Sequence, residues 1–296
     1  MYRRIQNTDS VEDPAYWKSL NPGLSINSKA KSSLWTPKNF STEESAIKHN
    51  LITEGYFQSP KFLSSNRQAK MLSAVRGLRE SGWPVPFVFV YDIFWQSPRR
   101  LAPLLSSILG PGFRMLPDFW AWYVDHERYE EGWRRHRDRD ADCIGEDGLP
   151  QSLTVWIALT DATIDNGCIF VLPANKDPRY RKDFRELTID NPRDVHALAC
   201  PAGTLLAWNQ VVLHWGGRSH PAAANSRVSF AYEFQRGDVP AHNRPLLDPM
   251  NPPNFHQRLA LIAKQVLQYK HMYLLSDQLV EVAENLVTSF SLPDSV

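Results

Sequence analysis

Between residues 152 and 235 the chain reads, in turn, SLTVWIALT (152–160), GCIFVLP (167–173), GTLLAWNQVVLHW (203–215) and RVSFAYEFQ (227–235). Each run is short and rich in β-branched and aromatic residues, which is typical of a strand. VPFVFVYDIFW (85–95) and FWAWYVD (119–125) have the same composition and predict two more strands. No regular helix between these runs is long enough for repeated parallel crossovers. We therefore expect antiparallel pairing in a β-sandwich or jelly roll.

Helices are expected outside this β core. Ser41 and Glu44 have the spacing of a capping box and predict a helix that ends before Gly55. A second helix is expected at about 65–81, where apolar residues repeat with helical spacing. A third begins at Ser97-Pro98 and closes at 110–111, with an internal proline expected to bend it. The predicted class is therefore mainly β with flanking helices (α+β).

The two ends of the chain differ in pattern. Residues 1–40 show no sustained period and predict an irregular N-terminal arm. Helical spacing returns at about 254–290, where Ser276 or Asp277 could cap a further helix. Residues 41–296 are therefore expected to form a single domain that carries N-terminal helices and a C-terminal helical segment.

Composition excludes several classes of protein. The 296 residues carry 33 Lys+Arg against 32 Asp+Glu and are 43% hydrophobic, as in ordinary globular proteins. This balance argues against disorder, and against dedicated nucleic-acid or anionic-membrane binding, which require a basic surplus. We expect no signal peptide and no membrane span, and a small molecule as the partner. The sparse Cys143, Cys168 and Cys200 indicate a reducing, cytoplasmic compartment. The oligomeric state is left open.

Two separated segments could supply metal ligands. His136 and Asp138 are two residues apart, so on an extended strand they would project from one face. His214 follows an apolar run and could reach the same point from another strand, which would complete two imidazoles and a carboxylate. Each signal has an ordinary structural alternative. The first pair lies among four arginines and would also suit a solvated, ion-paired loop, and a single histidine is more often a core residue.

A possible anion site follows in the last of the quoted runs. Arg227 and Ser229 are two residues apart on a predicted strand and therefore share a face. A planar guanidinium and a hydroxyl together suit one carboxylate. The alternative is a structural arginine paired with a neighbouring acid.

Four segments together resemble the phytanoyl-CoA dioxygenase family of iron(II)- and 2-oxoglutarate-dependent oxygenases: GWRRHRDR (132–139), LTVWIALTDATIDNGCIFVLPANKD (153–177), PAGTLLAWNQVVLHWGG (201–217) and SRVSFAYEF (226–234). The resemblance covers about 85–236. It implies a double-stranded β-helix, a cupin-like jelly roll. It also implies that His136, Asp138 and His214 bind iron(II). Arg227 would bind the far carboxylate of 2-oxoglutarate, with Ser229 beside it.

Several aromatic residues lie near these motifs. Trp156, on the strand after the His-x-Asp pair, is a candidate for lining the 2-oxoglutarate pocket. Trp120 and Trp122 are candidates for shaping the substrate cavity. Strand aromatics are otherwise core residues. Cys168 in the NGC turn is interpreted as packing rather than as a nucleophile.

The resemblance implies a dioxygenase that uses O2 and 2-oxoglutarate and releases succinate and CO2. Related halogenases carry a small residue where this chain has Asp138, so hydroxylation of an aliphatic C–H, or desaturation, is favoured. The substrate is expected to be a small or medium organic molecule. Two alternatives remain. A cupin-like metal oxygenase or isomerase without 2-oxoglutarate would not need Arg227 and Ser229, and a β-sandwich binding protein would need neither these residues nor the metal ligands.

Overall fold

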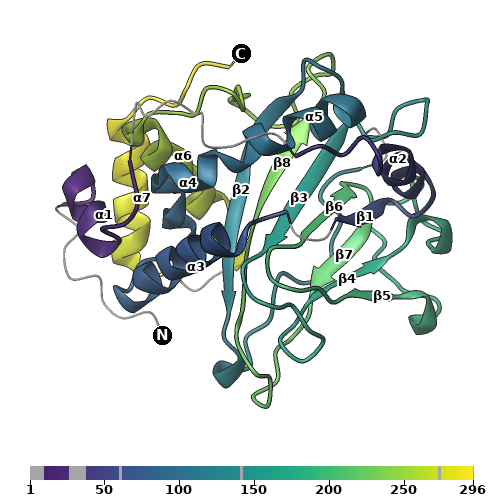
Figure 1. Ribbon diagram of the computed structural model, residues 1–296, viewed down its shortest axis with the longest axis horizontal. Helices are drawn as coiled ribbons and strands as arrows, with labels where there is room; N and C mark the ends of the chain where they lie inside the picture. Colours follow the sequence, from purple (N-terminus) through teal and green to yellow (C-terminus); the bar gives the residue numbers. More distant parts are fainter. Residues whose placement is uncertain (1–9, 27–37, 60–61, 141–142, 273–274, 296) are drawn as a thin grey trace.

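Two antiparallel sheets form the centre of the protein (Figure 1). The computed structural model describes residues 10–26, 38–59, 62–140, 143–272 and 275–295. The larger sheet has the order β1 (Tyr56–Ser59), β6 (Leu205–Asn209), β3 (Ser152–Ala158), β8 (Arg227–Gln235) and β2 (Arg114–Val124). The smaller sheet has the order β5 (His196–Leu198), β4 (Ile169–Leu172) and β7 (Leu213–Gly216). Every described strand pair is antiparallel, and the arrangement is the expected double-stranded β-helix.

Strand β8 shows why the larger sheet has two different faces. Successive side chains on a strand point to opposite sides. Four aromatic or apolar side chains of β8 pack in the main hydrophobic core on one side: Val228, Phe230, Tyr232 and Phe234. The alternate set faces the smaller sheet: Arg227, Ser229, Ala231 and Glu233. One strand therefore supplies both the core and a polar row for a site.

Helices cover the first of these faces, on the left of Figure 1. The α-helices are α1 (Pro14–Leu20), α2 (Glu44–Thr53), α3 (Ser65–Glu80), α4 (Asp92–Trp95), α5 (Ser97–Leu109), α6 (Phe255–Gln268) and α7 (Asp277–Ser289). Short 3-10 helices are η1 (Val85–Val90), η2 (His126–Arg128), η4 (Ala174–Lys176), η5 (Pro192–Asp194) and η6 (Lys270–Met272). None of the helices among the described residues is long and apolar enough to cross a membrane.

The predicted strand at 85–95 is wrong, because this segment forms η1 and the short α4. Pro84 and Pro86 lack the backbone N–H that a strand in a sheet interior would donate. Every residue from Val85 to Trp95 is buried, so the run is apolar on all sides. A continuous apolar run of this kind does not distinguish a strand from a buried helical segment.

The other predicted helices were confirmed, and they begin and end close to the expected residues. The helix expected at 65–81 is α3, and the one expected at 97–110 is α5, which contains Pro103. The C-terminal segment divides into α6, which begins with a capping box at Asn254, and α7, which Ser276 caps.

Two details at the N-terminal side differ from the prediction. Ser41 forms no cap, since α2 begins at Glu44 after Glu43, which makes no side-chain capping bond. The described part of the arm expected to be irregular contains α1, which begins after an Asp13 cap. Residues 1–9 and 27–37 of this arm lie outside the described residues. The Trp17 side chain of α1 is fully buried, and this burial fixes the helix against the core.

Candidate metal centre

Backbone pairing brings the predicted metal ligands together. His136 and Asp138 lie in the irregular segment between η2 and β3, and His214 lies in β7. His136 and His214 exchange both backbone hydrogen bonds, each at 3.0 Å. The segment of His136 is therefore an isolated bridge rather than the extended strand that we expected. One ligand atom from each of the three side chains nevertheless lies within 4.8 Å of the other two.

Hydrogen bonds set the tautomer of both imidazoles. His136 Nδ1 donates to the Arg134 carbonyl at 2.6 Å, and His214 Nδ1 donates to the Val212 carbonyl at 3.0 Å. A carbonyl can only accept, so in the neutral form of each imidazole Nε2 carries a lone pair instead of a proton. These two atoms lie 3.3 and 3.5 Å from Asp138 Oδ1, which is also an acceptor.

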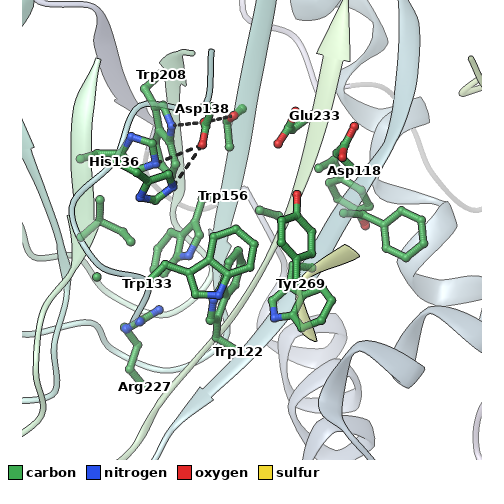
Figure 2. A pocket seen from close by; sticks show the side chains of 18 residues that line it. Asp118, Trp122, Trp133, His136, Asp138, Trp156, Trp208, Arg227, Glu233 and Tyr269 are labelled. Atoms are coloured by element: carbon green, nitrogen blue, oxygen red, sulfur yellow. Dashed lines mark hydrogen bonds and ion pairs between the residues drawn. The ribbon is translucent and has the colours of Figure 1, made fainter. Parts of the chain in front are cut away.

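The other oxygen of Asp138 is held by the larger sheet (Figure 2). Oδ2 accepts hydrogen bonds from Thr154 Oγ1 at 2.7 Å and from Trp208 Nε1 at 3.1 Å. His136 Nε2 is buried and has no hydrogen-bond partner among the described residues. Three acceptors that converge in this way suit a bound cation. The donor set, two imidazoles and one carboxylate, is the one that non-haem iron(II) binds with open positions left over.

Asp138 and His214 are in the protonation states that a metal needs. Burial alone would raise the pKa of Asp138, but His214 and His136 beside it hold that pKa well below its usual range. Burial lowers the pKa of His214 to about 4. Burial also opposes protonation of His136, although Asp138 outweighs it and raises the pKa of this imidazole. At neutral pH the carboxylate is therefore ionised and His214 is neutral.

Arg227 lies in the same cavity as the metal ligands. It begins β8 and is only 1% exposed, and its Nη1 donates to Ser229 Oγ at 2.9 Å. Its guanidinium carbon lies 5.8 Å from the centre of the Trp156 ring. In Figure 2, Trp156 lies between the metal ligands and Arg227. Trp156 Nε1 is buried with no hydrogen-bond partner among the described residues, so it is a second donor at this end of the cavity.

Two glycines that the sequence analysis missed make room for Arg227. A Cβ on Gly132 would lie 2.6 Å from the Gly216 Cα and 2.7 Å from Arg227 Nη2. A Cβ on Gly216 would lie 2.7 Å from the Gly132 Cα. The available signal was their position, since one precedes the His-x-Asp segment and the other follows His214.

The cavity extends away from the metal ligands toward β2 and α6. It encloses about 520 Å³ of empty space, including the part open to solvent. Trp120 and Trp122 line it, where the sequence placed them. Further lining residues were not predicted: Asp118, Trp133, Thr154, Trp208, Glu233 and Tyr269. The alternation along β8 could have identified Glu233, because it shares a face with Arg227.

Residues 91–226 match the phytanoyl-CoA dioxygenase (PhyH) family. The match covers just under half of the chain. The matched segment contains all three candidate ligands and ends one residue before Arg227. The resemblance drawn from the sequence is thus confirmed, and the family is one of iron(II)- and 2-oxoglutarate-dependent oxygenases. A search of curated proteins found no match.

Solved structures resemble this chain in fold. One is the epimerase SnoN in complex with Fe3+, alpha ketoglutarate and nogalamycin RO. It is 16% identical with a TM-score of 0.52, over 72% of this chain and 95% of that chain. Another is HygX from Streptomyces hygroscopicus with nickel and 2-oxoglutarate bound. It is 14% identical with a TM-score of 0.52, over 66% of this chain and 88% of that chain. At this level of identity the likeness concerns the fold.

Proposed function

We propose that the protein is an iron(II)- and 2-oxoglutarate-dependent dioxygenase that hydroxylates an aliphatic C–H of a small or medium organic substrate. One observation carries the proposal. The Nε2 atoms of His136 and His214 and the Oδ1 atom of Asp138 converge as three acceptors, in one cavity with the buried Arg227. The PhyH-family match supports the same reading.

Each residue of the site has a distinct task in this proposal. His136, Asp138 and His214 hold the metal ion on one side and leave its other positions open. Iron(II) with 2-oxoglutarate and O2 would supply the oxidising power, converting C–H to C–OH and 2-oxoglutarate to succinate and CO2. Arg227 and Ser229 bind the far carboxylate of 2-oxoglutarate, a charge-assisted contact in a buried place.

Two features of the site argue against halogenation and against a mechanism without 2-oxoglutarate. Asp138 fills the third ligand position, which halogenation would leave to chloride. Arg227 and Ser229 support a carboxylate-bearing cosubstrate, because a planar guanidinium and a hydroxyl in the cavity of the metal ligands together suit one carboxylate. A cupin-like oxygenase that works without 2-oxoglutarate would have no use for this pair.

A histidine substitution tests the proposal. His136→Ala removes one of three ligands, so we expect Mn²⁺ affinity measured by calorimetry to fall by about 100-fold or more, and 2-oxoglutarate-dependent succinate formation to be lost. His49→Ala is the matched control, because His49 is an exposed residue of α2. Unchanged succinate formation in a folded His136→Ala protein would contradict the proposal.

A further inference from the structure

Two carboxylates lie at the end of the cavity opposite Arg227, and we call them the acidic end: Asp118 on β2 and Glu233 on β8. The pairing of β2 with β8 shifts register between Met115 and Phe119, and Asp118 lies within this irregularity. Asp118 is only 3% exposed. Glu233 pairs with Thr154 across the sheet, which places it beside the residue that holds Asp138.

One guanidinium serves both carboxylates of the acidic end. Arg139 Nη2 donates to Glu233 Oε2 at 3.0 Å and contacts Asp118 Oδ2 at 3.4 Å. Asn243 donates to Asp118 and Gln210 donates to Glu233, but neither amide brings charge. The two carboxyl groups therefore share one guanidinium in a buried place.

Lys264 is the next cation, and its charge interacts with Asp118, but its Nζ forms no direct ion pair with either carboxyl group among the described residues. Its Nζ donates to Asn243 Oδ1 at 3.1 Å and to Gln268 Oε1 at 3.3 Å, which are amide oxygens. It does not line the cavity, whereas Asp118 and Glu233 do. Burial, and then the Asp118 carboxylate, raise the pKa of Glu233 well above its usual value. Glu233 therefore keeps its proton more readily than an ordinary carboxyl group, and a cation placed beside it would lower that pKa and favour the ionised form.

Aromatic rings form the side of the cavity next to the acidic end, and we call them the aromatic wall: Trp120, Trp133 and Tyr269. The Trp133 and Tyr269 ring centres lie 4.6 Å apart, and those of Trp120 and Tyr269 lie 5.2 Å apart. Figure 2 shows the Tyr269 hydroxyl directed toward the two carboxylates. Aromatic faces attract cations and apolar carbon, and they repel anions.

The two ends of the cavity therefore differ in hydrogen-bonding character, with donors at one end and acceptors at the other. The end near Arg227 and Trp156 offers donors, which suit an anionic cosubstrate. The other end offers acceptors and ring faces, which an anion would avoid. Building on the function proposed above, we propose that the acidic end binds a protonated amine of the substrate, with the attached carbon skeleton against the aromatic wall and directed toward the metal ligands.

Matched probes test this assignment by binding rather than turnover. Calorimetry of the Mn²⁺- and 2-oxoglutarate-loaded protein would compare phenethylamine with 2-phenylethanol, and glucosamine with glucose. Each pair exchanges an amine for a hydroxyl on the same skeleton. We expect the amine of at least one pair to bind about 10-fold or more tightly, as for a charge-assisted hydrogen bond. Equal affinity within both pairs, tighter binding of both neutral compounds, or no binding of any probe would overturn the proposal.

Isosteric variants test whether the acidic end causes the preference for an amine. Glu233→Gln and Asp118→Asn keep the shape of the acidic end and remove charge, so we expect either variant to reduce the amine preference at least about 5-fold and leave binding of the neutral partner unchanged. Exposed Glu127 on η2 provides the control Glu127→Gln. An amine preference that persists in both folded variants would overturn the assignment. If neither variant folds, the wild-type comparison still decides it.

The two proposals fail separately in this design. Binding of Mn²⁺ and 2-oxoglutarate, titrated first without any probe, reports on the proposed oxygenase function alone. If both bind and the amine pairs show no discrimination, only the substrate class is wrong. If neither binds, the oxygenase function itself is contradicted, whatever the probes do.

Discussion

Asp138 uses its two oxygens differently. Oδ2 accepts from Thr154 and Trp208, while Oδ1 faces the two imidazoles. The fixed Oδ2 prevents rotation of the carboxylate, so Oδ1 stays directed at the metal position. Preorganisation of this kind places the ligands before the metal arrives and increases affinity.

At Arg227 we expect charge to matter more than the neighbouring hydroxyl. Arg227→Ala removes a buried guanidinium from the proposed 2-oxoglutarate site, at a cost of about 2 to 5 kcal/mol in binding. Ser229→Ala removes a hydroxyl that hydrogen-bonds to Arg227 but no charge, at a cost of about 1.5 kcal/mol. Calorimetric titration of 2-oxoglutarate into the Mn²⁺-loaded variants measures both. An unchanged dissociation constant in Arg227→Ala would assign the cosubstrate to a different residue.

Glu233 gives a pH-dependent effect on stability. A carboxyl whose pKa is higher in the folded than in the unfolded protein binds a proton on folding, so its favourable contribution is complete below the unfolded pKa, near 4.5. That contribution is lost as pH rises through the folded pKa. We therefore expect wild type to lose free energy of unfolding relative to Glu233→Gln as pH rises from the unfolded pKa, near 4.5, to the higher folded pKa. Urea denaturation of both metal-free proteins across this range measures the difference, and a difference that grows with the opposite sign would refute the raised pKa.

Side-chain chemistry explains which site residues the sequence could predict. His136, Asp138 and His214 were found because few residue types bind iron and their order along the chain is distinctive. Thr154 and Trp208 were not, because both contact Asp138 only through the register that pairs β3 with β6. That register depends on the assembled sheet and not on any local pattern.

Among the elements, β7 must approach the segment before His136 closely. We expect Gly216→Ala to displace Arg227 or separate the two segments, because its Cβ would lie 2.7 Å from the Gly132 Cα and 3.0 Å from Arg227 Nη2. The free energy of unfolding should fall by about 1 to 3 kcal/mol, as in other overpacked sites. Affinity for 2-oxoglutarate should fall as well.

Gly112→Ala is the control for this substitution, since a Cβ there would have no atom within 4 Å. Denaturation and calorimetry on the two variants separate close approach from a general glycine effect. Equal behaviour of Gly216→Ala and Gly112→Ala would show that the two segments can move apart freely.

Element type was predictable where the apolar pattern alternates and not where it is continuous. Strand β8 has one apolar and one polar face, and its assignment from sequence was confirmed. The segment 85–95 is buried on every side between α3, α6 and β2, so its apolar residues show no helix or strand periodicity. Its prolines were the better indicator.

In the molecule as a whole, the main hydrophobic core and the candidate metal centre lie on opposite faces of the larger sheet. The helices and the face of the sheet they cover form the main hydrophobic core, whereas the metal ligands and the cavity lie on the other face. A buried ion pair links the helical layer internally, since Arg258 on α6 donates to Asp92 on α4 at 2.6 Å. Changes in this layer should therefore alter folding before they alter binding.

Trp17 on α1 tests this separation at a distance from the site. Its ring stacks on Phe87 with centres 5.4 Å apart, contacts Trp83 at 4.8 Å, and its Nε1 donates to the Val11 carbonyl at 2.7 Å. Trp17→Ala should lower the free energy of unfolding by about 3 to 5 kcal/mol, the usual cost of truncating a buried aromatic residue. Ile164→Ala, at a residue that is 60% exposed, should change it by less than about 0.5 kcal/mol.

Under conditions where Trp17→Ala remains folded, its affinity for Mn²⁺ should equal that of wild type. A small stability change would mean that α1 is a dispensable arm, and a large loss of Mn²⁺ affinity would mean that the helical layer and the metal centre are coupled through the sheet.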